Sequence, residues 1–203
     1  MIMNSPTSDY RLLERYASPM GGVFSTSDLR SLFDEGRNVY LKRRIDRLAQ
    51  EGLLTRFCRG FFTTPAFDHA VLAMRLNPQS YVSLGSALAR ELMIGSVPAR
   101  ALYCVKTGSA RAYSSPALTV TFLAIAPHLY FGFRTINAVQ FALPEKALLD
   151  TLYFHLRGHT FSFDIFSDID ISRLDTAALA DFLSHYRNPR FVQFVKGYLN
   201  DRR

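Results

Sequence analysis

The sequence predicts an α+β protein built in two parts. In its first third, short amphipathic helices precede a basic helix and a hairpin around Arg59-Gly60. From Leu102 onward, β-branched and aromatic runs alternate with turns, which is typical of strands. Helical patterns return at Pro144 and continue toward the C-terminus. These observations predict an N-terminal winged helix-turn-helix, followed by a mixed domain with an antiparallel sheet and C-terminal helices.

Composition and charge narrow the possible partners. The chain has 203 residues, of which 48% are hydrophobic, so it can bury a substantial core. Its formal charge is +7, and seven Lys or Arg against two acids lie between Arg37 and Gly60. Clustered positive charge favours a polyanionic partner. No apolar run approaches the ~18 residues of a membrane span and no signal peptide is recognisable, so we expect a cytoplasmic protein with no membrane partner.

The two cysteines, Cys58 and Cys104, lie in different segments. No CxxC motif or Cys/His spacing typical of metal sites accompanies them. We therefore expect reduced thiols, no bound metal and no cofactor.

The N-terminal elements follow a recognisable order. Asp9 to Tyr16 is amphipathic, and the hydroxyl-rich Ser25–Asp28 run is a capping pattern for a second helix, Ser27–Phe33. Val23-Phe24 is a small strand or turn, and Asn38 is a candidate cap for the third helix. Three helices followed by a hairpin match the winged helix-turn-helix order.

The third helix has one apolar face and one basic face. Leu41, Ile45 and Leu48 form a stripe with i, i+4, i+7 spacing. At about 100° per residue, Tyr40, Arg43 and Arg47 point to the opposite side. Gly52 is suited to end the helix, because it tolerates positive φ.

This helix and the hairpin supply the candidate DNA-binding residues. An exposed arginine on a recognition helix can bond guanine O6 and N7, while arginines on the wing meet phosphates or the minor groove. By geometry, Arg43 and Arg47 rank ahead of Lys42 and Arg44, which lie on the flanks. The full set of candidates is Arg37, Asn38, Tyr40, Lys42, Arg43, Arg44, Arg47, Arg56 and Arg59.

The remainder, residues 67–203, is expected to form the second domain, with residues 1–66 as the DNA-binding domain. Expected strands are Leu102–Thr107, Ala110–Tyr113, Leu118–Ile125, His128–Phe133 and Ala138–Ala142. Expected helices are Phe67–Leu76, Leu84–Leu92, Pro144–Leu156, Asp175–Arg187 and one capped by Asn188, with Tyr81–Ser83 leading into the second of these.

Motifs that suggest catalysis have simpler interpretations. Glu145-Lys146 follows Pro144 at a helix start, whereas nuclease sites need Glu-x-Lys spacing on a strand. Gly108-Ser109 and Asp168–Asp170 are too far apart for a nucleotidyltransferase site. The Tyr130–Phe133 run is read as sheet core in preference to a base-stacking platform. We therefore expect a protein that is not an enzyme.

Three segments together resemble a known family. They are FSTSDLRSLF…RRIDRLAQEGLLTRFCRGFFTT, PQSYVSLGSAL and LYFGFRTINAVQFALPEKALLDTLYF, spanning Phe24 to Phe154. The chain resembles the AbiEi-type antitoxins and transcriptional regulators of type IV toxin–antitoxin systems. Pro144–Leu148 and Tyr81–Leu88 are the more distinctive parts of this resemblance.

The resemblance implies a repressor that binds inverted repeats in the double-stranded promoter DNA of its own operon. Its second domain would oppose a nucleotidyltransferase-like toxin in phage defence by abortive infection, typically without a stable complex between the two proteins. The alternative is a ligand-responsive winged-helix regulator without a toxin partner, in which the Leu102–Ala142 sheet encloses a small molecule.

Overall fold

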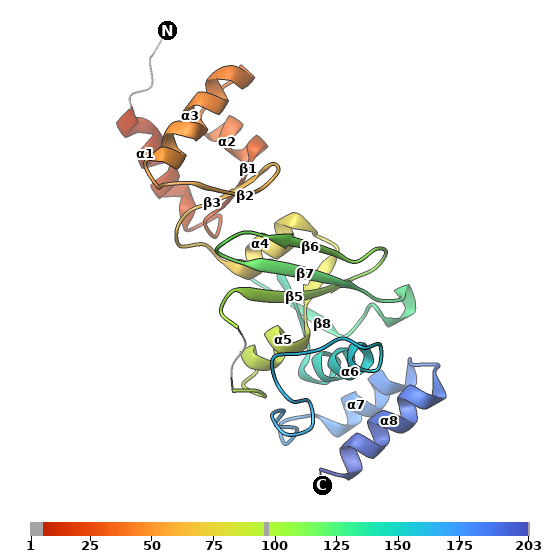
Figure 1. Ribbon diagram of the computed structural model, residues 1–203. Coiled ribbons are helices and arrows are strands. Elements are labelled where there is room, and N and C mark those ends of the chain that lie inside the picture. The colour runs from red at the N-terminus through yellow and green to blue at the C-terminus, as the bar shows by residue number, and fades with distance from the viewer. Residues whose placement is uncertain (1–5, 96–97, 203) are drawn as a thin grey trace. The chain divides into compact units, whose positions relative to one another are not determined.

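The computed structural model describes residues 6–95 and 98–202, and the chain divides into two compact units after Leu72 (Figure 1). Both units combine helices with a sheet, so the predicted α+β class is confirmed. The division falls six residues beyond the expected boundary after Ala66. None of the helices in the described ranges has the length and apolar character needed to cross a bilayer.

Unit 1 contains three helices and one small sheet. Its elements are α1 (Pro6–Ala17), β1 (Val23–Ser25), α2 (Thr26–Leu32), α3 (Asn38–Gln50), β2 (Thr55–Cys58) and β3 (Phe61–Thr63). The strands lie in the order β1-β3-β2, and both pairings are antiparallel. The predicted helices, the hairpin and the small strand at Val23-Phe24 are therefore all present.

The helix starts of unit 1 confirm one predicted cap and correct another. Ser25 caps α2: its Oγ accepts from the amide of Asp28 at 3.1 Å, and the Asp28 carboxylate accepts from the Ser25 amide at 2.6 Å. The expected cap of α3 by Asn38 is wrong, because Arg37 occupies the N-cap position. The Asn38 side chain instead accepts a bond from Arg30 of α2 at 2.6 Å.

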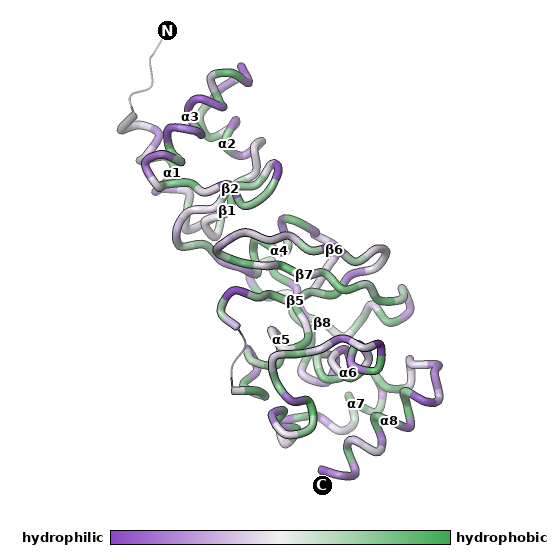
Figure 2. The backbone as a smooth tube through the Cα atoms, in the orientation of Figure 1, coloured by the Kyte–Doolittle hydropathy of each residue, from purple (hydrophilic) through white to green (hydrophobic). Residues whose placement is uncertain are grey.

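The core of unit 1 lies under α3. Leu41, Ile45 and Leu48 are buried as predicted, and they pack in one cluster with Phe24 and Phe33. Figure 2 shows hydrophilic and hydrophobic residues alternating along the turns of α3, as expected for a helix with one buried face. The hydrophobic contacts therefore fix which face of α3 remains exposed.

Unit 2 is built around a mixed sheet of six strands in the order β6-β7-β5-β4-β9-β8. The strands are β4 (Ser80–Val82), β5 (Ala101–Lys106), β6 (Arg111–Ser114), β7 (Thr119–Ala124), β8 (Phe133–Ile136) and β9 (Val139–Ala142). The predicted antiparallel sheet needs correction, because β5 with β7 and β4 with β9 are parallel pairs. After β5 the chain first forms edge strand β6, so the returning β7 runs alongside β5 in the same direction.

Two strand assignments differ from the prediction. Tyr81–Ser83 was expected only to lead into a helix; a helix does begin at Leu84, but Ser80–Val82 before it also forms β4, near the middle of the sheet between β5 and β9. The expected strand His128–Phe133 is mostly wrong, since Pro127–Leu129 is a 3-10 turn and β8 begins only at Phe133. Proline has no amide proton to donate to a sheet, which favours the turn.

The remaining helices are α4 (His69–Leu76), which crosses the division between the units, α5 (Leu84–Arg90), α6 (Pro144–His155), α7 (Thr176–Ser184) and α8 (Pro189–Asn200). Helices α5 and α6 contact strands of this sheet, and α7 and α8 pack against α6. The predicted caps are confirmed: the Asp175 carboxylate accepts from the amide of Ala177 at 2.8 Å, and the Asn188 side chain accepts from the Arg190 amide at 3.0 Å. Helix α7 ends three residues before the predicted Arg187.

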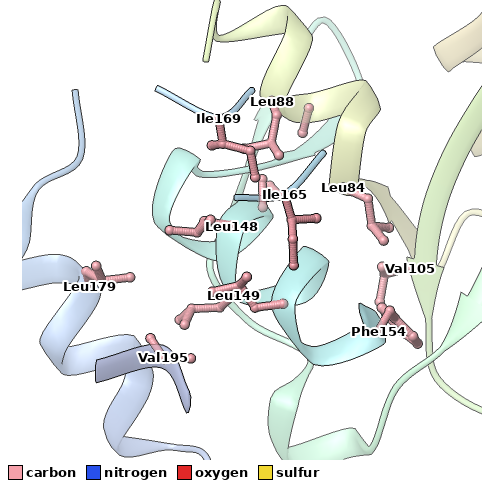
Figure 3. Close-up of a cluster of buried hydrophobic side chains, with 14 of the residues drawn as sticks. Leu84, Leu88, Val105, Leu148, Leu149, Phe154, Ile165, Ile169, Leu179 and Val195 are labelled. Atoms are coloured by element: carbon pink, nitrogen blue, oxygen red, sulfur yellow. The ribbon is translucent and has the colours of Figure 1, made fainter. Parts of the chain in front are cut away.

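The hydrophobic core of unit 2 gathers around α6. Figure 3 shows Leu148 and Leu149 of α6 among side chains from α5, α7, α8 and the segment that contains Ile165 and Ile169. Helix α6 begins with Pro144 and carries Glu145 in its first turn, as predicted. The Glu145 carboxylate accepts from the amide of Asp175, the N-cap of α7, at 2.9 Å. The start of α6 therefore also holds the start of α7.

A buried polar network crosses this core, and we call it the Lys146 network: Lys146, Asp150, Tyr81, Ser83 and Tyr186. Lys146 and Asp150 are fully buried one helical turn apart and form an ion pair. Tyr81 and Ser83 donate to the second oxygen of Asp150 at 2.9 and 2.8 Å, and Lys146 donates to the Tyr186 hydroxyl at 3.1 Å. Burial raises the pKa of Tyr81 and of Tyr186 well above the usual range, so both stay protonated.

Removing one charge of this pair should destabilise unit 2 strongly. Lys146→Met leaves Asp150 charged and buried, and we expect a loss of about 3–5 kcal/mol in the free energy of unfolding. Adding Asp150→Asn should recover part of this loss, because the amide oxygen still accepts from Tyr81 and Ser83 while the uncompensated charge is gone. Urea denaturation followed by circular dichroism measures both effects.

The matched control is Lys196→Met on the exposed part of α8, which should change the free energy of unfolding by less than about 0.5 kcal/mol. A double variant that is less stable than Lys146→Met alone would contradict the proposed role of the ion pair.

Candidate nucleic-acid interface

The N-terminal half of α3 exposes a cluster of aromatic and cationic side chains. Tyr40 is 43% exposed, and the guanidinium carbons of Arg37 and Arg43 lie 5.7 and 5.9 Å from the centre of its ring. These are cation–π distances. We call Arg37, Tyr40 and Arg43 the Tyr40 cluster. Asn38 and Val39 are also exposed beside it, so this end of the helix presents a continuous surface to solvent.

Two predicted contact residues, Arg44 and Arg47, are engaged inside unit 1. Both guanidinium groups bind the carboxylate of Asp9 in α1: Arg44 Nε lies 3.1 Å from one oxygen, and Arg47 Nη2 lies 2.5 Å from the same oxygen. Asp9 is completely buried, whereas the Arg44 and Arg47 side chains are 14% and 35% exposed. These bonds tie α3 to α1.

Arg44 has further partners. Its Nη1 donates to the backbone oxygen of Phe33 at 3.0 Å, and its guanidinium carbon lies 4.6 Å from the centre of the Phe33 ring. Arg44 therefore connects α3 to α1 and to the end of α2. A DNA-contacting role for Arg44 or Arg47 remains a prediction, and it competes with this structural role.

Asp9 was not singled out from the sequence. It shares one face of α1 with the buried Leu13, four residues later. A carboxylate on an apolar helix face needs a buried partner of opposite charge, and this chain is rich in arginine. An acidic residue on an apolar helix face in an arginine-rich chain is the sequence signal that could have predicted the buried ion pairs of Asp9.

The hairpin β2–β3 places two exposed arginines near the tip. Arg56 lies in β2 before an irregularity in the pairing, and Arg59 lies in the turn beside Gly60, whose φ of +85° suits glycine. The Gly60 carbonyl oxygen accepts from the Thr26 amide at 2.9 Å. Because Thr26 begins α2, this bond holds the tip of the hairpin against the start of that helix.

The remaining candidate, Lys42, is exposed on the flank of α3. The structure thus leaves a set of predicted residues exposed: Arg37, Asn38, Tyr40, Lys42, Arg43, Arg56 and Arg59. Exposed guanidinium groups on short, packed elements can donate in pairs to phosphate oxygens or to guanine edges. These side chains can therefore donate hydrogen bonds to the oxygens of an anionic ligand.

The acidic loop of unit 2 has an ordinary structural explanation. The Asp168 carboxylate accepts from the amide of Asp164 and the hydroxyl of Ser167, each at 2.8 Å, and these bonds lower the pKa of Asp168. Asp170 likewise accepts from the Ser172 amide at 2.9 Å. Within the described part of the chain, no group of three or more His, Cys, Asp or Glu side chains could hold a metal ion.

Comparison with known proteins identifies the fold and no family. No protein-family model matches the chain, and no curated protein matches it. The crystal structure of the Rv2827c protein from Mycobacterium tuberculosis is similar, with a TM-score of 0.59 and 17% sequence identity. The similarity covers 92% of this chain and 74% of that one, so the fold is shared across both units.

Removing the Asp9 carboxylate should loosen unit 1. In the Asp9→Ala variant, Arg44 and Arg47 lose their shared partner, and we expect a loss of about 2–3 kcal/mol, less than for a fully buried pair because Arg47 can turn to solvent. Asp46→Ala, which removes an exposed carboxylate from α3, is the control and should be nearly neutral. Equal stability of the two variants in thermal unfolding would contradict the role assigned to Asp9.

Proposed function

We propose that this protein is a sequence-specific DNA-binding transcriptional repressor. In this proposal unit 1 is a winged helix-turn-helix, α3 is its recognition helix and the β2–β3 hairpin is its wing. The order of helices and strands and the antiparallel hairpin support this assignment. The charge of +7 and its concentration between Arg37 and Gly60 support DNA as the partner.

The Tyr40 cluster carries the proposal. Two arginines flank one aromatic ring at the exposed start of α3, where recognition helices contact base edges. Arg43 is assigned to base or phosphate contact from the helix, and Arg56 and Arg59 are assigned to phosphates beside the wing. The ring of Tyr40 limits the positions of both guanidinium groups, so less side-chain entropy is lost on binding.

We further propose that the protein acts as the antitoxin of a type IV toxin–antitoxin system. The support is the resemblance of its motifs to AbiEi-type antitoxins, above all Pro144–Leu148 and Tyr81–Leu88. Both motifs contribute to the Lys146 network, so the resemblance lies in residues that organise unit 2. The proposed functional partner is a nucleotidyltransferase-like toxin encoded beside it.

Loss of Arg43 should weaken operator binding without unfolding the protein. With a fluorescent DNA fragment from the region upstream of its reading frame, we expect Arg43→Ala to reduce affinity about tenfold and to lower the slope of log affinity against log salt by about 0.9. Arg11→Ala removes the same charge from the exposed side of α1 and should leave both values unchanged. Unaltered binding by the Arg43→Ala protein would refute the assignment of α3 as the recognition helix.

The two proposed activities should separate genetically. If promoter binding belongs to unit 1 and neutralisation to unit 2, Arg43→Ala should derepress a promoter–reporter fusion several-fold and still rescue growth when the neighbouring nucleotidyltransferase-like protein is expressed. Lys146→Met should impair the rescue through loss of unit 2. Failure of the wild-type protein to rescue growth would remove the antitoxin proposal and leave the DNA-binding proposal standing.

A ligand-responsive regulator is the second candidate. The observation that favours it is a cavity of about 330 Å³ in unit 2 with aromatic and basic walls. This cavity lies against α6, α8 and the Pro127–Leu129 turn, and not within the sheet as the sequence suggested.

A further inference from the structure

We propose that Val39 of α3 contacts the methyl group of a thymine, close to a guanine bound by Arg43. This inference rests on the proposed DNA-binding function and names the bases that the same helix recognises. Val39 is 62% exposed, although valine is among the residues most often buried. It lies in the first turn of α3, one position before Tyr40, so the exposed surface of this helix includes an apolar side chain.

Val39 lies on the outermost side of the helix. At about 100° per residue, Val39 and Arg43 both fall within about 30° of the direction opposite the buried stripe of α3. Because they are four residues apart, their side chains are neighbours on consecutive turns. Asp46 follows Arg43 by three residues and is exposed on the same side. We call Val39, Arg43 and Asp46 the Val39 row.

The chemistry of the Val39 row suits base edges better than the phosphate backbone. Phosphates bind arginine, but they gain nothing from valine and repel the carboxylate of Asp46. In the major groove each member has a match: the thymine methyl group for Val39, O6 and N7 of guanine for Arg43, and the cytosine amino group for Asp46. Asp46 forms no hydrogen bond or ion pair with any residue that the structure describes, so its oxygens can accept from a base.

The residues on both sides of the row are suited to hold it over the groove. Lys42 is exposed on one side, and Tyr40 with Arg37 lies on the other. Cations on both sides can bind phosphates of the two strands, and such contacts set the position and orientation of a helix without reading sequence. The row between them then faces the base edges.

The length of the row corresponds to a few base pairs. At a rise of about 1.5 Å per residue, Arg43 lies about 6 Å beyond Val39 along the helix axis, and Asp46 about 4.5 Å beyond Arg43. Base pairs follow one another at about 3.4 Å, so the row spans about three base-pair steps. We therefore expect a thymine, a guanine and a cytosine within about four consecutive base pairs of one half-site.

The test compares two bases that differ by one methyl group. The binding site is first selected from randomised duplex DNA with the full-length wild-type protein. Each thymine of the selected half-site is then replaced in turn by deoxyuridine, which keeps the hydrogen-bonding edge and lacks the methyl group. We expect one replacement to weaken wild-type binding about fourfold, the contribution of one buried methyl group.

Protein variants assign this methyl contact to a side chain. Val39→Ala should weaken binding to the thymine-containing site by a similar factor, and the deoxyuridine replacement should then have no further effect. Asp46→Ala should reduce discrimination at one cytosine and strengthen binding to random-sequence DNA, because a repelling charge is gone. Leu92→Ala is the matched control: it shortens a 69% exposed aliphatic side chain in unit 2 and should bind like the wild type.

The outcomes separate this inference from the DNA-binding proposal. A wild-type protein that selects no sequence refutes both. A selected site at which no deoxyuridine replacement lowers affinity overturns the methyl contact and leaves the DNA-binding proposal standing. A methyl effect that persists at full size in Val39→Ala assigns the contact to another residue and also overturns the inference. Alanine favours helix more than valine does, so Val39→Ala should keep α3 intact, and circular dichroism checks this.

Discussion

The ion pair between Lys146 and Asp150 is the interaction on which unit 2 depends. A charge removed from water is costly unless its partners satisfy it, and here Asp150 receives donors from Tyr81, Ser83 and Lys146. Those donors join strand β4 and the turn after it to helix α6. The bond from Lys146 to the Tyr186 hydroxyl extends the hydrogen-bonded network to the segment that follows α7. Breaking any of these bonds leaves a buried polar group without a partner, so the bonds restrict how β4, α6 and the segment after α7 can pack.

Unit 1 uses a carboxylate for a different purpose. Asp9 binds Arg44 and Arg47 from the buried side of α3. Some basic residues of this stretch therefore hold the helix in place, whereas others remain exposed to solvent. Arg37 and Arg43 belong to the second group, on either side of Tyr40. Fewer arginines are therefore exposed on α3 than the count of basic residues suggests. The bonds from Asp9 to Arg44 and Arg47 hold this helix in place.

The features that were predicted correctly from the sequence are those set by residues only a few positions apart in the chain. The Ser25 capping box, the buried stripe of α3 and the cap at Asp175 were all expected, because each is specified within a few positions. Contacts between distant residues were missed. Asp9 lies 35 positions before Arg44, and Tyr81 lies 69 positions before Asp150, so no local pattern reveals either pair. The parallel pairings of the sheet, and the cavity beside α6 and α8, were unpredictable for the same reason.

The short strand β4 has a consequence for the order of synthesis. Its Val82 pairs with Phe141 of β9, so the middle of the sheet cannot close until that later segment has been made. Unit 1 has its own core and is complete at Leu72, 69 residues before Phe141. At roughly 5–20 residues per second, synthesis of this interval takes about 3–14 s. Each newly made chain thus passes through a period in which unit 1 can already fold while the six-stranded sheet of unit 2 has not yet formed.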